Sequence, residues 1–433
     1  MTESLITADW LNLLASQGKL LVGFSGGLDS TVLLHTLAQH PALRAKLCAV
    51  YINHGLSSHA NCWQIHCQQF CTIYAIPLLI ETIEFIRTAN IEEEARNARY
   101  LAFAALLQPD DCLLLAHHCD DQAETLLLQL LRGAGIDGLA AMSAEKPFAS
   151  GKLCRPLLQH SRQTLSDYAQ LHNLTWVDDE SNQDSVYSRN YLRQQIMPLL
   201  RARWPGAVGN LVRTTQHCQQ AKNNLQALAY LDCAELVPQH NTLPIPILRT
   251  LAHDRLSNVL RTWLKNNEIR LPPTTIFNRL LSEVVFADVD AQPCVQWGGV
   301  KVLRYQQTLY LLKNNQQYVP SPVLWTHFPK PVNLAGGGYL QARVVACAGV
   351  RIASTSEVRV DFRRGGETFQ WHGQTKQLKK LWQEWQIPPW ERDSIPLIYI
   401  DNCLAIVVGF AISDQYYQEN CVDSLYVIDW HKE

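Results

Sequence analysis

The sequence has no run of about 18 or more uninterrupted apolar residues, so we expect no membrane-spanning helix. The opening residues, MTESLITADW, lack a basic segment leading into an apolar stretch, which is the pattern of a secretory signal. The 13 cysteines include no CxxC pair, and the closest two, Cys67 and Cys71, lie one helical turn apart. Neither a zinc-ligand spacing nor a disulfide framework follows from this pattern. A reduced cytoplasmic compartment is therefore the simplest expectation.

A strong charge imbalance is also missing. The formal net charge is −2 at pH 7, so a polyanionic partner would have to be bound by local basic patches. Hydrophobic residues make up 47% of the chain and charged residues 18%, which is ordinary for a globular protein and gives no reason to expect disorder. Because 433 residues are too many for one hydrophobic core, we expect two or three domains.

A strand, a tight turn and a helix are predicted by LLVGFSGGLDSTVLLH, residues 20–35. The apolar run Leu20–Phe24 has the length of a buried strand, and a second apolar run begins at Thr31. The turn between them contains Gly26 and Gly27, which can adopt backbone angles closed to other residues. This arrangement places the start of a helix directly after a flexible turn.

The start of this helix is a candidate phosphate site. Asp29 or Ser30 can cap the helix, and the unpaired amide groups of its first turn would point at one spot. The positive end of the helix dipole lies behind that spot, which favours an anion. A Walker A loop is excluded because no lysine follows the glycines, and the dinucleotide pattern GxGxxG is absent. The simpler alternative is a Gly-Gly turn that only joins two core elements.

Asp29 is unusual in a phosphate-binding turn. Its carboxylate would repel phosphate oxygens unless a cation lies between them. We therefore expect Mg²⁺ to be bound together with the nucleotide, with Asp29 as a metal ligand.

Short apolar strands alternate with helical stretches after this turn. The alternation is typical of βαβ units and predicts an α/β fold with a parallel sheet, whose strands end at one common edge. Polar clusters follow three of the strands, SGGLDS, NHG and HHCDD, so we expect one shared site at that edge. The other predicted strands are Leu47–Ile52, Leu78–Phe85 and Cys112–Ala116, and the predicted helices between them are Ser57–Tyr74 and Asn90–Leu107.

An acidic segment follows the last of these strands. We expect a helix to begin near Asp120. In such a helix the side chains of Asp121 and Glu124 face the same way, because residues three apart share a helix face. Three acidic residues within five positions repel one another unless they hold a cation. The alternative is an acidic first turn that only complements the helix dipole.

Together these motifs resemble a known family. SGGxDS is the phosphate-binding signature of the N-type ATP pyrophosphatases, the PP-loop superfamily, and the accompanying motifs resemble those of the tRNA(Ile)-lysidine synthase family. Near the C-terminus, RRGGETF and KQLKKLWQEWQIPPWERDSIPLI resemble the terminal tRNA-binding domain of that family. The other matching motifs are NHGLSSHANCW (Asn53–Trp63), EEARNARY (Glu93–Tyr100), HHCDDQAET (His117–Thr125), RGAGIDGL (Arg132–Leu139) and DDESNQDSVYSRNYLR (Asp178–Arg193).

The resemblance implies a two-step reaction. ATP would adenylate the C2 oxygen of the wobble cytidine in a tRNA(Ile) with a CAU anticodon. The ε-amine of free L-lysine would then displace AMP and form lysidine. The amine arrives protonated at neutral pH, because its ordinary pKa is about 10.4, so carboxylates are needed to bind it and to accept its proton.

The resemblance also implies roles for individual residues, but the sequence does not rank the acidic candidates among themselves. The expected ATP contacts are Ser25, Gly26, Gly27, Leu28, Asp29, Ser30 and His54. The expected catalytic residues are Asp29, Asp120, Asp121, Glu124 and Asp137, with His118 as an alternative base and Arg132 near the adenylate. The expected tRNA contacts are Arg189, Arg193, Arg363, Arg364, Lys376, Lys379 and Lys380.

Several of these side chains have a structural alternative. His54 could be a structural histidine at a strand end, and Arg96 and Arg99 could pair with the glutamates of their own helix instead of holding catalytic loops. Arg189 and Arg193 could simply cover the surface. We favour contact with substrate phosphates, because no acidic residue occurs between Ser185 and Arg203.

Three domains are predicted: a catalytic domain over residues 1–236, a small α+β domain over residues 237–318, and a β-rich C-terminal domain over residues 319–433. The middle domain should contain two amphipathic helices and a hairpin through Gly298 and Gly299. In the C-terminal domain, one helix is expected at Thr375–Trp385, and basic residues alternate with Phe362, Phe369 and Trp371. That mixture suits an RNA backbone with a stacked base, although solvated charged surfaces are a common origin of such runs.

Other functions of the same fold would require different sequence features. A tRNA thiolase would have cysteine pairs near the site, and an asparagine synthetase would have a cysteine where this chain has Thr2. A catalytically silent tRNA-binding protein of the same fold is the alternative from a different functional class. The sequence leaves the oligomeric state open, with a homodimer as one option.

Overall fold

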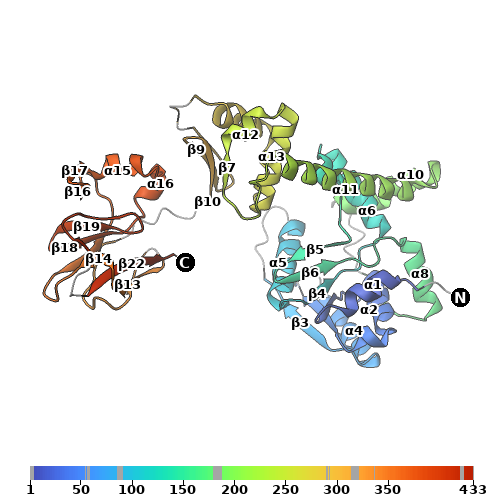
Figure 1. The fold of residues 1–433 in the computed structure, drawn as a ribbon. Coiled ribbons are helices and arrows are strands. Elements are labelled where there is room, and N and C mark those ends of the chain that lie inside the picture. The colour runs from blue at the N-terminus through green and yellow to red at the C-terminus, as the bar shows by residue number, and fades with distance from the viewer. Residues whose placement is uncertain are drawn as a thin grey trace. The chain divides into compact units, whose positions relative to one another are not determined.

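The protein is described by a computed structural model that covers residues 4–53, 55, 59–84, 91–178, 188–288, 291, 293–313, 321–335, 337–419 and 424–432. The chain forms two compact units, Met1–Leu228 and Ala229–Glu433 (Figure 1). None of the helices that the structure describes has both the length and the hydrophobicity that a membrane span requires.

Six strands form one sheet in the N-terminal unit, in the order β3-β2-β1-β4-β6-β5 (Figure 1). Neighbouring strands are parallel except that β5 runs antiparallel to β6, which confirms the predicted α/β fold. The β5–β6 hairpin was not predicted. The strands are β1 (Leu20–Gly23), β2 (Leu47–Asn53), β3 (Leu78–Thr82), β4 (Cys112–Leu114), β5 (Glu145–Phe148) and β6 (Gly151–Cys154).

Helices connect these strands and continue beyond the sheet. Those that connect or flank strands β1 to β6 are α1 (Ala8–Ala15), α2 (Leu28–Ala38), α3 (Pro41–Arg44), α4 (Ala60–Ile73), α5 (Ile91–Leu106), α6 (Cys119–Leu131) and α7 (Ile136–Leu139). Those that follow the sheet are α8 (Arg162–Leu171), α9 (Ser188–Tyr191), the π-helical segment η2 (Leu192–Ile196), α10 (Met197–Arg203) and α11 (Ala207–Asp232).

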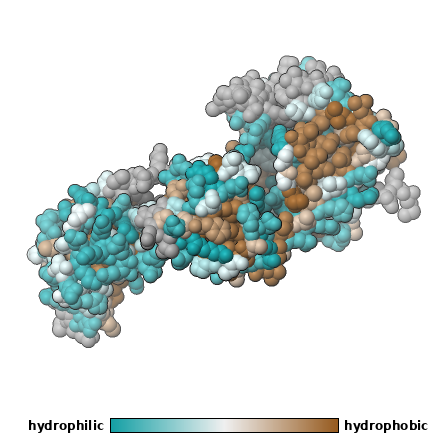
Figure 2. Space-filling view, turned by 90° about the horizontal axis from the view of Figure 1, so that it is seen from above, coloured by the Kyte–Doolittle hydropathy of each residue, from teal (hydrophilic) through white to brown (hydrophobic). Residues whose placement is uncertain are grey.

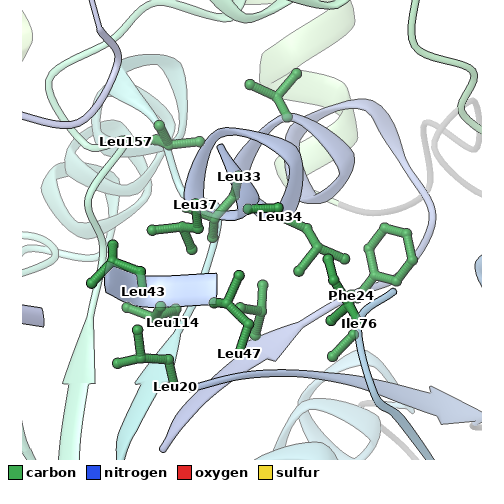
Figure 3. Packing of buried hydrophobic residues seen from close by; sticks show 14 of the residues in the cluster. Leu20, Phe24, Leu33, Leu34, Leu37, Leu43, Leu47, Ile76, Leu114 and Leu157 are labelled. Carbon is green, nitrogen blue, oxygen red and sulfur yellow. The ribbon is translucent and has the colours of Figure 1, made fainter. Parts of the chain in front are cut away.

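The core of this unit lies between the sheet and helix α2. Strand β1 is central, since Leu20 pairs with Leu47 of β2 on one side and with Cys112 of β4 on the other. Figure 3 shows leucines of α2 packed against leucines of these three strands. Burying one such side chain stabilises the fold by about 1.5–3 kcal/mol, so this packing fixes where the loop between β1 and α2 stands.

Helix α2 also buries a histidine. The His35 side chain lies 3.0 Å from the Tyr168 hydroxyl through Nδ1 and 3.0 Å from Gln39 through Nε2. Burial, with a smaller effect of His172, lowers the pKa of His35 to about 4. The unfolded chain, with an ordinary histidine pKa, therefore binds more protons than the folded chain between pH 4 and 6.5.

Acidification should therefore destabilise the N-terminal unit through His35. We expect its free energy of unfolding to fall by about 3 kcal/mol between pH 7 and pH 4 from this group alone, at about 1.4 kcal/mol per pH unit. Urea unfolding of wild type and His35→Gln at both pH values measures the effect. The variant should lose less stability on acidification, and an equal loss in both proteins would contradict the expectation.

The second unit begins with a helical layer on a small antiparallel sheet. Its core includes Ala229, Cys233 and Leu236, and the division between the two units falls within α11, after Leu228. The domain boundary at residue 236 stays a prediction. The elements are β7 (Thr242–Pro244), α12 (Ile245–Thr250), α13 (His253–Asn266), α14 (Thr274–Arg279), π-helical η3 (Leu280–Val285), β8 (Cys294–Trp297), β9 (Val300–Tyr305) and β10 (Thr308–Lys313). The predicted turn at Gly298 and Gly299 joins β8 to β9. The predicted boundary at residues 318 and 319 lies outside the described residues.

The C-terminal part consists mainly of strands in two five-stranded sheets and one hairpin. Its face in Figure 2 is mostly hydrophilic. The elements are β11 (Val323–Leu324), β12 (Val332–Asn333), β13 (Tyr339–Val345), β14 (Ala348–Arg351), β15 (Val358–Asp361), β16 (Thr368–Trp371), β17 (Gln374–Gln377), α15 (Leu378–Glu384), α16 (Pro389–Arg392), β18 (Leu397–Ile400), β19 (Cys403–Val407), β20 (Ala411–Ile412), β21 (Tyr417–Glu419) and β22 (Leu425–His431).

The helix predicted at Thr375–Trp385 is shorter in the structure. Residues 374–377 form strand β17 instead, because they pair with β16, with Lys376 opposite Phe369. Helix α15 begins only at Leu378, where the side chain turns into the core.

Candidate active site

The loop between β1 and α2 leaves the start of the helix open. Gly26 has a φ of 80°, and a β-carbon there would lie 3.0 Å from the Cys67 sulfur, so glycine is required. Gly27 is the N-cap of α2 and has no side chain to cap the first amide groups. The prediction that Asp29 or Ser30 caps this helix is wrong, because both residues lie inside its first turn. The uncapped amides remain available to an anion.

Two serines stabilise this loop. The Ser25 and Ser30 hydroxyl oxygens lie 3.2 Å apart, and the Ser30 hydroxyl donates to the Gly27 carbonyl at 3.0 Å. The Gly27 amide in turn donates to the Ser25 hydroxyl at 3.4 Å. These contacts hold the hydroxyl groups beside the open helix start.

A cavity of about 380 Å³ lies where strands β1, β2 and β4 end. Residues of the glycine loop and of the double-histidine segment both line it, so the topology brings the two motifs into one site, as expected. The lining includes Ser25, Gly27, Leu28, Asp29, Ser30, Trp63, Arg99, His117, Asp121, Arg162, Val177, Asp178 and Arg193.

His118 lies beside three carboxylates. Its Nε2 atom is 3.5 Å from Oδ2 of Asp29 and 3.5 Å from Oδ2 of Asp121, and its Nδ1 atom is 3.6 Å from Oδ2 of Asp120. Burial by itself would lower the pKa of His118, but these carboxylates outweigh that effect and raise it to about 10. The ring is therefore an imidazolium at neutral pH, which does not suit the predicted role of a base.

His117 differs from its neighbour. Burial, reinforced by nearby arginines such as Arg155, lowers the pKa of His117 to about 3. Its Nδ1 atom accepts a hydrogen bond from Nε of Arg155 at 3.2 Å. A neutral ring with so low a pKa is a weak base, so a carboxylate is the better proton acceptor in this cavity.

Asp121 and Glu124 form one anionic pair on the first turns of α6, as the spacing predicted. Arg189 donates to Asp121 at 2.7 Å and to Glu124 at 2.9 Å. Arg193 donates to the same two carboxylates at 3.1 and 2.7 Å. Both arginines were expected to contact tRNA phosphates, but in the structure their guanidinium groups bind these acids. Asp121 and Glu124 are about one helical turn apart, and so are Arg189 and Arg193. Because the two spacings are similar, each arginine can contact both acids.

Asp120 is not among the residues that line the cavity. Its carboxylate accepts a hydrogen bond from the Arg162 amide at 2.8 Å and pairs with Arg201. Burial opposes ionisation of Asp120, but the His118 contact and the Arg162 amide lower its pKa to about 2. These contacts favour a structural role for Asp120.

The charged side chains in and beside the cavity are balanced among the described residues. Each carboxylate has a cationic side chain within ion-pair distance, so an incoming ammonium group must compete with an arginine or with the His118 imidazolium. The carboxylates are Asp29, Asp120, Asp121 and Glu124, and the cations are His118, Arg189, Arg193 and Arg201.

Two predicted site residues lie elsewhere. Arg132 follows the last residue of α6, about 18 Å along the helix axis from Asp120, and Asp137 lies on the next short helix, α7. Both are exposed, and neither lines the cavity. Their predicted positions near the adenylate and the lysine amine are therefore not seen in the structure. His54 lies outside the described residues.

Arg162 is a cavity residue that the sequence analysis did not select. It is the first residue of α8, after a strand that was not predicted, so no neighbouring motif pointed to it. Arg99, for which the sequence left two roles open, also lines the cavity. Both add positive charge to a site expected to hold phosphates.

Asp29 is suited to hold a cation. Its Oδ1 atom is buried without a hydrogen-bond partner, at the helix start where phosphates would bind. The described residues contain no group of three or more acidic, histidine or cysteine side chains arranged for a metal. Mg²⁺ would therefore take its other ligands from phosphate and water, as it commonly does.

The basic residues of the C-terminal part differ in their contacts. Arg363 pairs with Asp393 at 3.0 Å, Arg364 with Asp361 at 3.2 Å, and Lys376 with Glu384 at 2.9 Å. Lys379 and Lys380 are exposed on α15, and no carboxylate among the described residues pairs with them. These two lysines are the best placed of the five to meet a phosphate backbone.

Comparison with known proteins covers nearly the whole chain. Family models match at residues 3–200 (PP-loop domain), 243–310 (TilS substrate binding domain) and 358–430 (TilS substrate C-terminal domain). The tRNA(Ile)-lysidine synthase of Legionella pneumophila (strain Paris) is 49% identical over 99% of this chain and 100% of its own length. That of Coxiella burnetii (strain RSA 493 / Nine Mile phase I) is 39% identical over 94% of this chain and 92% of its own. Among solved structures, the U34-tRNA thiolase of Methanococcus maripaludis matches with 19% identity and a TM-score of 0.40, over 48% of this chain and 73% of that one.

Proposed function

The chain belongs to the tRNA(Ile)-lysidine synthase family, and from that premise we propose that its N-terminal cavity is the place where ATP and lysine modify the tRNA. The protein is a ligase that forms lysidine on tRNA(Ile) at the expense of ATP. The observation that supports the location is the shared cavity, which is lined by both the glycine loop and the acidic start of α6.

In the first step, the C2 oxygen of the wobble cytidine attacks the α-phosphorus of ATP, and pyrophosphate leaves. The uncapped amides of α2 and the hydroxyls of Ser25 and Ser30, which lie beside the start of that helix, would bind the departing phosphates. Asp29 would hold Mg²⁺, which neutralises developing charge on the phosphate oxygens. Arg99 and Arg162 add positive charge to the same cavity.

In the second step, the ε-nitrogen of lysine attacks C2, the C2–oxygen bond to the adenylate breaks, and AMP leaves. The ammonium group must first give up a proton, and Asp121 is the carboxylate of the α6 pair that lines the cavity. Asp121 and Glu124 would bind the ammonium in place of an arginine contact. We assign His118 to positioning, because its imidazolium contacts both Asp29 and Asp121.

Incubation with ATP, radiolabelled lysine and a tRNA(Ile) transcript tests this function. The expected result is label in the anticodon loop, with mass analysis showing lysine on the wobble cytidine. A silent tRNA-binding protein would bind the transcript and transfer no label. A thiolase would instead leave a mass change that contains sulfur.

Reversing the charge of Lys379 and Lys380 should weaken tRNA binding. With both changed to glutamate, we expect a dissociation constant raised about tenfold at low salt and a shallower salt dependence, because fewer counterions are released on binding. Filter binding at several salt concentrations measures both quantities. Lys330→Glu, at another exposed lysine of the same part of the chain, is the control. If the double variant showed the same salt dependence of tRNA binding as the wild type, the RNA would not contact these two lysines.

We also propose that the protein works in the cytoplasm. The cysteines among the described residues are all free thiols, which suits a reducing cytoplasm. A homodimer remains one option for the assembly, and light scattering with and without tRNA would measure it.

A further inference from the structure

A second cavity, of about 560 Å³, lies in the C-terminal part. It is formed by the turn between β16 and β17, by β19 and β20, and by β22, so segments far apart in the sequence meet around it. Its volume falls in the range of small-molecule sites. The lining includes the aromatic side chains of Trp371, Phe410 and Tyr417 and the carboxylates of Asp414 and Asp429.

Aromatic rings stand at this cavity although water reaches them. Phe410 is 44% exposed and Tyr417 is 43% exposed. Phe410 is nonetheless held in place by two neighbouring rings. Its ring is stacked on that of Trp385, with the ring centroids 5.7 Å apart, and makes a T-shaped contact with that of Trp382, with the centroids 6.1 Å apart. Rings that are fixed and exposed are suitable platforms for stacking a planar group.

A carboxylate acceptor is fixed beside these rings. Oδ2 of Asp414 accepts a hydrogen bond from the Gly373 amide at 2.7 Å, and the Asp414 amide donates to the Gln370 carbonyl at 3.2 Å. Both contacts tie Asp414 to the β16–β17 hairpin. A carboxylate oxygen accepts from an amino group and would repel a carbonyl, so it favours bases with an exocyclic amine.

Positive charge is present on the neighbouring helix. Trp385, on which Phe410 stacks, is the C-cap of α15, and the same helix has Lys379 and Lys380 exposed in its first turn. Aromatic surface close to unpaired lysines is the combination that single-stranded nucleic acid requires, with bases on the rings and phosphates at the cations.

We infer that this cavity binds one unpaired adenine, cytosine or guanine of the tRNA substrate, stacked on Phe410 with its exocyclic amino group at Asp414. The inference rests on the proposed function, which supplies the tRNA. It explains why aromatic side chains remain exposed on a domain whose visible face is mostly hydrophilic (Figure 2). A peptide or a second copy of this chain would have less use for the fixed carboxylate acceptor.

Photo-crosslinking locates the base. The full-length protein with a benzophenone amino acid in place of Phe410 is irradiated with the tRNA(Ile) transcript, and the crosslinked nucleotide is mapped by primer extension. A crosslink to an unpaired adenine, cytosine or guanine is expected, and a crosslink to an unpaired uracil would also contradict the inference. Crosslinks only to base-paired nucleotides, only to protein, or to nothing would overturn the inference.

Binding measurements test the chemistry. Phe410→Ala should weaken tRNA binding about tenfold, from lost stacking, while the KM for ATP stays unchanged. Leu324→Ala, at another exposed apolar residue of the same part of the chain, is the control. Replacing the mapped base with uracil should weaken binding to the wild type but not to Asp414→Asn, whose amide can donate to a carbonyl. Equal affinity of the wild type for both bases would contradict the assignment of Asp414.

Two further readouts separate the possible failures. Thermal unfolding midpoints within about 2 °C of wild type would show that the variants are folded. If Phe410→Ala does not fold, Tyr417→Ala replaces it as the test variant. Lysine transfer by the wild type tests the proposed function independently. Normal transfer with unaffected binding in the Phe410 and Tyr417 variants would overturn only the base-binding cavity.

Discussion

Replacing Asp29 with alanine is expected to lower the rate of pyrophosphate release by about a thousandfold while tRNA binding changes by no more than a few-fold. The Asp29 carboxylate lies at the open start of α2, where its buried Oδ1 atom has no protein partner. Without it, no described side chain at that position can bring a cation to the phosphates. The substitution also removes one of the three carboxylates around His118.

The measurement is pyrophosphate release under single-turnover conditions, together with filter binding of tRNA. Asp9→Ala removes an exposed carboxylate from α1 of the same unit and should leave both quantities unchanged. Asp29→Asn keeps the size of the side chain but not its charge, and should be nearly as inactive as the alanine variant. If Asp29→Ala released pyrophosphate at the wild-type rate, Asp29 would not be the residue that holds Mg²⁺ for this step.

Replacing Asp121 with asparagine should separate the two chemical steps. We expect adenylation to continue within about tenfold of the wild-type rate, while the KM for lysine rises about a hundredfold and adenylated tRNA accumulates. The physical reason is that an amide offers a lysine ammonium no charge and cannot accept its proton. Loss of one interaction with a charged group in a buried site commonly costs a factor of this size.

Pyrophosphate release and lysine incorporation, measured separately over a range of lysine concentrations, test this expectation. Asp120→Asn is the matched control, since it removes a carboxylate from the same helical turn that pairs with Arg201 outside the cavity. We expect that control to lower stability without a selective rise in the lysine KM. Equal effects of the two variants on lysine KM would show that Asp121 has no special part in binding the amine.

The arginines around Asp121 and Glu124 bear on how lysine enters. Arg189 and Arg193 leave only 23% and 28% of their side chains exposed, and both use their guanidinium groups on the acidic pair. Removing one partner of such a buried pair costs about 3–5 kcal/mol, so these contacts hold α9 and η2 against α6. If lysine binds at Asp121 as proposed, its ammonium group would have to replace one of these arginine contacts.

The sequence by itself determined the local elements of the site. The glycine turn between β1 and α2, the alternation of strands and helices, and the common face of Asp121 and Glu124 all follow from patterns within a few residues. Such patterns are dictated by backbone geometry, by the alternation of apolar runs and by the 3.6-residue period of a helix. The cap of α2 was still misassigned, because glycine at an N-cap leaves no side-chain signal.

Only the tertiary structure decided which charges meet. Arg189 and Arg193 reach Asp121 across 68 and 72 residues of sequence, and no local spacing encodes contacts of that length. The same holds for Asp29, the one of the three carboxylates around His118 that is distant in sequence, and for Arg132 and Asp137, which lie in a matching motif but outside the cavity. Motif residues are neighbours along the chain, whereas the pKa of a side chain and its access to a cavity depend on the elements that pack around it.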